Sequence, residues 1–235
     1  MNQFQNNAGA VDASFSTATT KKFLLSVYNW MAMGLALTGV VAYGIYNSSA
    51  VYAIAGNPIL YFGLFIVQLG VVMGLTFAIN KISSGVAIGA FFLYAALTGL
   101  TFSVLFLVYT GASIASTFFI CAAMFGSVSV FGYITKIDLS KFGTYFFMAL
   151  IGLIVASIVN IFLNSTTLNW IISYAGVLIF VGLTAYDTQR IKRMSQTTDY
   201  DTEQGKKSAV MGALTLYLDF INMFLFLLRI LGNRK

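Results

Sequence analysis

Two aspartates are the residues of this chain whose type and placement most clearly suggest chemistry. Asp187 occurs in AYDTQRIK and Asp219 in LYLDFINMF, each in or beside a long apolar run, in a sequence of which only 9% is charged. A carboxylate at the centre of a bilayer costs roughly 2.5–3.5 kcal/mol on insertion scales, so acids inside membranes usually face other helices or water and have a function there. The placement predicts a functional pair.

The chemistry that such a pair can perform follows from its charge. Two carboxylates in one poorly solvated site cannot both ionise cheaply, so we expect Asp187 and Asp219 to share one proton and to titrate as one pH-sensing unit. Without that proton the pair would attract a cation, and the hard ion Ca²⁺ prefers oxygen ligands, usually about six to eight of them. Asn222, backbone carbonyls or water would have to complete such a calcium site.

Each of these residues also has a structural interpretation, which the sequence leaves open. Asp187 lies three residues before Arg190, the spacing of an ion pair on one helix face. Asn222 and Asn160 are candidates for polar support of the pair, but side-chain amides also hydrogen-bond neighbouring helices in membranes.

Composition excludes most catalytic and cofactor sites. The chain has no histidine, so the usual zinc sites and the Ser-His and Cys-His catalytic pairs cannot form. Its one cysteine, Cys121, cannot form an intrachain disulfide. The formal charge of +6 comes from basic residues in small groups between apolar segments, so we expect no nucleic-acid partner. We expect that the chain is not an enzyme and carries no cofactor.

The elements that must position the two acids are membrane spans. The chain is 59% hydrophobic with a mean hydropathy of +0.86, whereas soluble domains are about 45–50% apolar. A span needs about 20 residues. We predict a disordered polar tail over residues 1–20 and an all-α seven-helix bundle over residues 21–235. The predicted spans are residues 23–46, 59–79, 85–109, 114–134, 142–163, 170–189 and 209–230.

Lys and Arg predict the orientation, because short cytoplasmic loops carry an excess of them. The loops NSSAVYAIAGNP, TGAS and NSTTLN have no charged residue and are predicted to lie outside. The N-terminus is then cytoplasmic, in what we expect to be a bacterial inner membrane. The residues that indicate the cytoplasmic side are Lys21, Lys22, Lys81, Lys136, Lys141, Arg190, Lys192, Arg193, Lys206 and Lys207.

The C-terminus disagrees with this charge pattern. Seven spans place Arg229, Arg234 and Lys235 outside, whereas a re-entrant last segment would return them to the cytoplasm. Residues 209–230 are long enough to cross, so we predict seven full spans.

Two further expectations concern packing. For the acids to meet, the last two helices must extend into the cytoplasmic loop and turn near TTDYDTEQG, which has the polar, Gly-containing composition of a turn. The pairs Gly70 with Gly74 and Gly85 with Gly89 have the spacing that lets helices approach closely in lipid.

The segments around both acids resemble the Bax inhibitor-1 family. The matching stretches are AYDTQRI, LYLDFINMFLFLLRILG and the TGLTFS of the third span, and the resemblance extends from about Lys21 to the end of the chain. It implies six helices around a central C-terminal helix and a pH-sensitive calcium leak, governed by a hydrogen-bonded pair at the positions of Asp187 and Asp219. Some relatives add a basic latch, often arginine. Lys81 stands there in this chain and lacks the planar guanidinium fork.

Other functions remain open from the sequence. A non-conducting regulator of a membrane protease or of a stress or cell-death pathway would depend on the N-terminal tail. A seven-helix photoreceptor needs a Schiff-base lysine within a span, and the last span has none. A diaspartyl protease would be expected to carry a GxGD motif, which is absent.

Overall fold

The protein is a bundle of α-helices. The structure, a computed structural model, describes the backbone of residues 2–235 and the side chains of residues 18–235. Seven helical segments are long and apolar enough to cross a membrane, and no β-strand occurs among residues 2–235, which confirms the predicted fold class. In chain order the helices are α1 Asn2–Tyr46, α2 Ala50–Gly56, α3 Pro58–Ala78, α4 Ser84–Phe102, α5 Leu105–Val108, α6 Gly111–Ile134, the 3₁₀ helix η1 Leu139–Phe142, α7 Gly143–Leu163, α8 Thr166–Thr197 and α9 Glu203–Leu231.

The predicted spans agree with these helices to within a few residues, except at the start of α1 and where α8 and α9 meet. α8 continues to Thr197 and α9 begins at Glu203, so both helices extend well beyond their apolar parts. Thr202 caps α9, because its side chain accepts a hydrogen bond from the backbone N–H of Gly205 at 3.0 Å, and Glu203 lies in the positive first turn. The turn therefore falls within TTDYDTEQG, as expected.

The first helix is longer than predicted. α1 begins at Asn2, so the backbone of the polar residues for which we expected disorder continues the first span as helix. The division into a tail over 1–20 and a bundle over 21–235 remains a prediction.

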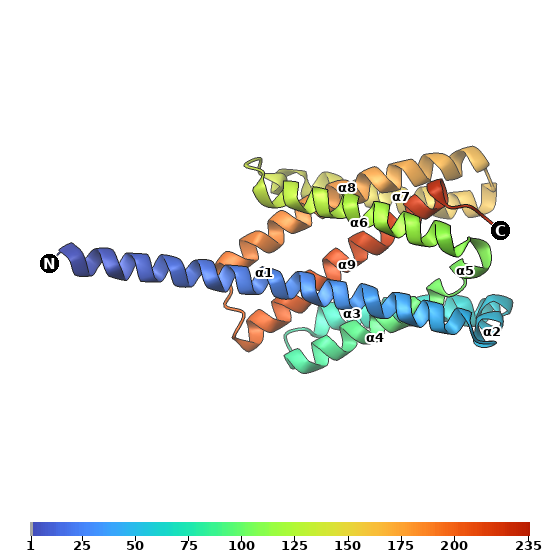
Figure 1. Cartoon of the computed structure of the whole chain (residues 1–235). Helices are drawn as coiled ribbons and strands as arrows, with labels where there is room; N and C mark the ends of the chain where they lie inside the picture. Colours follow the sequence, from blue (N-terminus) through green and yellow to red (C-terminus); the bar gives the residue numbers. More distant parts are fainter. Residues whose placement is uncertain (1) are drawn as a thin grey trace.

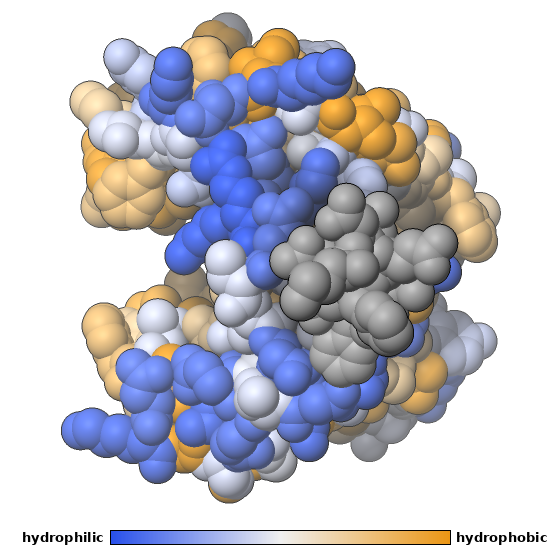
Figure 2. Space-filling view, turned by 90° about the vertical axis from the view of Figure 1, so that its left-hand side faces the viewer, coloured by the Kyte–Doolittle hydropathy of each residue, from blue (hydrophilic) through white to orange (hydrophobic). Residues whose placement is uncertain are grey.

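The connections sort to the two ends of the bundle (Figure 1). The α3–α4, α6–α7 and α8–α9 connections lie at one end, which we call the inner end. The opposite end carries α2, α5, the α7–α8 turn and the C-terminus, and we call it the outer end. Figure 2 looks onto the inner end, where hydrophilic side chains gather across the middle of the face. That gathering agrees with the charge pattern of the sequence.

The C-terminus lies at the outer end, because α9 is one continuous helix of 29 residues and not a re-entrant segment. Its last residues are held against the start of α6. The backbone N–H of Thr110 donates to the carbonyl of Asn233 at 3.0 Å, and that of Lys235 donates to Val108 at 2.9 Å. The ring of Tyr109 faces the guanidinium of Arg234 at 5.9 Å.

α9 forms the centre of the bundle, as expected. It packs against α1, α4, α6 and α8, while α3 packs on α4 and α7 packs on α8 at the periphery. Large side chains of α9, such as Tyr217, Leu216 and Met223, are fully buried. Because α9 is surrounded by helices, any polar group on it must find its partners inside the protein.

The glycines that permit close helix packing are not those expected. Nothing lies within 4 Å of a Cβ built on Gly70, Gly74 or Gly89, and one built on Gly85 would meet only Oγ of nearby Ser83 at 3.9 Å, so that expectation was wrong. Gly70 and Gly74 of α3 and Gly89 of α4 are all exposed, on faces of their helices that no neighbouring helix covers. The close approach occurs at Gly132 of α6, where a Cβ would lie 2.5 Å from the carbonyl oxygen of Ala185 in α8.

We predict that Gly132→Ala destabilises the bundle by roughly 1–3 kcal/mol, because the added methyl group meets backbone that cannot rotate away. Thermal unfolding in detergent measures the effect. Gly126→Ala, in the same helix with nothing within 4 Å, is the matched control and should be neutral or gain up to about 1 kcal/mol of helix propensity. Equal unfolding temperatures for the two variants would contradict the close α6–α8 contact.

Candidate functional site

The two aspartates lie in the interior, on helices that pack against each other. Asp187 of α8 is 7% exposed and Asp219 of α9 is 5% exposed. Asp219 lies about 24 Å along α9 from Glu203, at a rise of about 1.5 Å per residue. The predicted inner extension of both helices thus places Asp219 deep in the bundle.

The two carboxyl groups share one region, but each has its own local contacts. They are carried by α8 and α9, which pack against each other. No hydrogen bond joins them within residues 18–235, and Oδ2 of Asp219 is buried without a hydrogen-bond partner there. Oδ1 of Asp187 lies 3.9 Å from Nη1 of Arg190, whose side chain is 63% exposed, so this ion pair is weak. The structural alternative for Asp187, an i, i+3 contact with Arg190, is therefore present, and the pairing with Asp219 remains a prediction.

A buried hydrogen bond on the far side of α9 sets the direction of Asp219. The hydroxyl of Tyr217 lies 2.6 Å from Oγ1 of Thr38 in α1, and Thr38 also donates to the carbonyl of Ala95 in α4 at 2.9 Å. Residues two apart in a helix point about 200° apart. Tyr217, bonded toward α1 and α4, therefore turns Asp219 toward α8.

Several hydroxyl groups lie in the interior around α6 and α8. Thr188 donates to Oγ of Ser129 at 3.3 Å, which ties α8 to α6 one residue after Asp187. Oγ1 of Thr117 in α6 is buried and lacks a hydrogen-bond partner within residues 18–235. In the same part of the chain, no three His, Cys, Asp or Glu side chains gather as a metal site. A Ca²⁺ ion at the pair would need hydroxyl, carbonyl or water oxygens.

The other predicted site residues lie apart from the pair or make other contacts. Nδ2 of Asn222 donates to the carbonyl of Leu218 in its own helix at 2.8 Å. Oδ1 of Asn160 accepts from the backbone N–H of Ser165 at 3.1 Å, at the outer end of α7. Lys81 is exposed in the turn after α3 and makes no ion pair with either aspartate in the described part of the chain. Their proposed roles at the pair remain predictions.

Sequence reasoning missed a polar clamp at the inner end. Gln189 accepts a hydrogen bond from the N–H of Leu139 at 2.9 Å and donates to the carbonyl of Ile137 at 2.8 Å. Arg193 pairs with Asp138, and its guanidinium, together with Ser140, holds the pKa of the Asp138 carboxyl below its usual value. The clamp fixes the α6–α7 loop onto α8 just beyond Asp187. The one feature of the sequence that could have indicated this clamp is the i, i+4 spacing of Gln189 and Arg193, which places both side chains on one face of α8.

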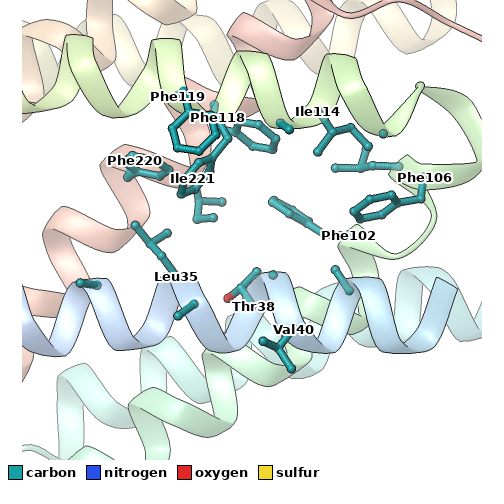
Figure 3. Close-up of a pocket in the computed structure, with 18 residues that line it drawn as sticks. Leu35, Thr38, Val40, Phe102, Phe106, Ile114, Phe118, Phe119, Phe220 and Ile221 are labelled. Atoms are coloured by element: carbon teal, nitrogen blue, oxygen red, sulfur yellow. The ribbon is translucent and has the colours of Figure 1, made fainter. Parts of the chain in front are cut away.

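Two apolar cavities lie between α1 and α6, one of about 690 Å³ toward the outer end and one of about 820 Å³ toward the inner end. Phe220, the neighbour of Asp219, lines both, and Figure 3 shows it beside Ile221 between the two helices. Thr38 is the one polar side chain that lines the outer cavity. Neither aspartate lines either cavity, so these spaces give an ion no polar path to the pair.

Comparison with known proteins gives consistent matches over nearly the whole chain. Residues 20–235 match a family described as inhibitor of apoptosis-promoting Bax1. The inner membrane protein YbhL of Escherichia coli K12 is 53% identical over 220 residues, 93% of this chain and 94% of that protein. An uncharacterized protein of Borreliella burgdorferi is 46% identical over 215 residues, 91% of this chain and 93% of its own length. The chain is thus a multi-pass protein of a bacterial inner membrane.

We predict that Thr38→Val destabilises the protein by about 1–3 kcal/mol, because the buried Tyr217 hydroxyl loses this partner. The free energy of unfolding in detergent measures the loss. Combined with Tyr217→Phe, the loss should be smaller than the sum of the single losses, because no hydroxyl is then left unpaired.

Thr76→Val is the control for this cycle, since Thr76 is exposed and bonds only to the carbonyl of Val72 in its own helix. Strictly additive effects of Thr38→Val and Tyr217→Phe would show that the Tyr217 hydrogen bond does not hold α9.

Proposed function

This chain belongs to the Bax inhibitor-1 family, and we propose that it is a pH-sensitive calcium leak channel in which Asp187 and Asp219 control opening. The observation that carries the proposal is the burial of both carboxyl groups on two helices that pack against each other. An unpartnered buried carboxyl oxygen is costly, and Oγ1 of Thr117 is the one other buried side-chain polar atom of residues 18–235 that lacks a hydrogen-bond partner. Membrane proteins keep such a costly buried group where the group has a function.

In this proposal, binding and loss of one proton control the charge of the Asp187–Asp219 pair. With one proton shared, the two carboxyl groups carry a single negative charge, which the packed interior between α8 and α9 tolerates more easily than two. Loss of that proton adds a second like charge at close range, and Arg190 is too exposed to neutralise it. The repulsion favours a state in which the helices separate and water enters.

Opening is then a shift in population between two states. The closed state is the packed bundle described above, in which the cavities beside Phe220 are apolar. In the open state the two carboxylates face water and supply the negative charge that attracts Ca²⁺. The hydroxyls of α6 and α8, including those of Thr117 and Thr188, would border the same water-filled space.

We predict that calcium efflux from vesicles containing the wild-type protein increases with pH as the pair loses its proton. Asp219→Asn keeps the shape of the side chain and removes its charge, so its flux should stay low and independent of pH. Fluorescence of a calcium dye, recorded at several pH values against protein-free vesicles, measures both.

Asp199→Asn is the matched control, because Asp199 is an exposed acid of the α8–α9 turn and its side-chain acceptor role toward Asp201 is kept by asparagine. Its pH profile should follow that of the wild type. An unchanged profile for Asp219→Asn would remove Asp219 from gating, and flux equal to protein-free vesicles at every pH would favour the non-conducting regulator.

A further inference from the structure

A third cavity, of about 390 Å³, lies at the outer end between α7, α8 and α9. Unlike the two apolar cavities, it is lined by five polar residues among seven, and it is remote from the inner-end clamp. The lining residues are Ser157, Asn160, Ile161, Asn164, Asn169, Ile172 and Arg229.

Arg229 is the one charged side chain of this lining; it is exposed, and no protein group of residues 18–235 hydrogen-bonds to its guanidinium. A guanidinium group carries five N–H donors in a planar fork. Within residues 18–235 that of Arg229 makes no ion pair and no hydrogen bond, and its contact is the ring of Phe226, whose centroid lies 5.3 Å away. Phe226 packs against Gly176 of α8, so the stacking directs the guanidinium toward α8.

The neighbouring groups add donors on the same side. The Oδ1 atom of buried Asn160 is occupied by the N–H of Ser165, which leaves its Nδ2 free to donate. Asn169 lies in the first turn of α8, a helix of 32 residues whose N-terminus carries partial positive charge. The cavity therefore combines a cation, amide donors and a helix N-terminus.

No acidic side chain opposes these groups. None of the seven Asp and Glu residues of the sequence falls between Lys141 and Tyr186, the stretch that supplies the α7 and α8 walls, and none follows Asp219. The α7 and α8 walls thus bring no carboxylate to Arg229, and no ion pair of Arg229 occurs among residues 18–235.

We propose that this outer cavity binds a phosphate group, held by the guanidinium of Arg229 and by the amides of Asn160 and Asn169. Arginine pairs with phosphate through two parallel N–H···O bonds. Trp170, stacked on Tyr174 at 5.9 Å and 45% exposed, marks the depth of the membrane interface beside the cavity. The phosphate is that of an outer-leaflet phospholipid head group or of a soluble phosphate ion, and the site is separate from the calcium pathway.

Native mass spectrometry of the protein in a neutral detergent tests the site, with short-chain phosphatidylglycerol as probe and diacylglycerol of the same chains as its phosphate-free counterpart. We expect the wild type to bind one phosphatidylglycerol in clear preference to diacylglycerol. Arg229→Gln should weaken that binding about tenfold or more, and Arg229→Lys should weaken it less, because lysine keeps the charge without the fork.

Arg234→Gln is the matched control, since it removes the same charge from the outer end without touching the cavity lining. Asn169→Ala, an exposed position, tests the site if Arg229→Gln does not fold. Competition by inorganic phosphate would identify a soluble anion as ligand, and its absence would identify the lipid head group. Equal binding by wild type, Arg229→Gln and Asn169→Ala, or equal binding of diacylglycerol, would overturn the proposal.

Discussion

The structure depends on the requirement that polar groups of a central helix be satisfied without bulk water. α9 is surrounded by α1, α4, α6 and α8, so its Tyr217 hydroxyl must bond inside the protein and does so with Thr38. On the opposite face Asp219 keeps a buried oxygen without a partner. One side of α9 is therefore fixed by a hydrogen bond, while the other carries a group whose preferred state changes with its charge.

The surrounding elements restrict where that change can act. At the inner end, Gln189 and Arg193 attach the α6–α7 loop to α8, and Gly132 brings α6 against Ala185. These contacts join α6, α7 and α8 into one half of the bundle, and Tyr217 ties α9 to α1 and α4 in the other half. The α8–α9 contact, with an aspartate on each side, lies between the two halves.

The sequence predicted the spans, because apolar length and charge placement determine them, whereas the central position of the last helix was implied by the resemblance to the family. It also predicted that Asp187 and Asp219 would share the interior, which required only that α8 and α9 extend to a turn near Asp199. It did not predict the inner clamp or the Arg229 cavity, since both join residues distant in the chain. The glycine spacing was misleading because a small residue permits close packing only where another helix lies against it, and Gly70 and Gly74 of α3 and Gly89 of α4 face no such helix.

The central claim, that the two aspartates act as one proton-binding unit, is most directly tested by infrared difference spectroscopy of the reconstituted protein over the pH range of calcium flux. The account predicts one carboxyl titration that coincides with opening and that disappears when asparagine replaces either Asp187 or Asp219. Two independent titrations, each surviving replacement of the other residue, would contradict it.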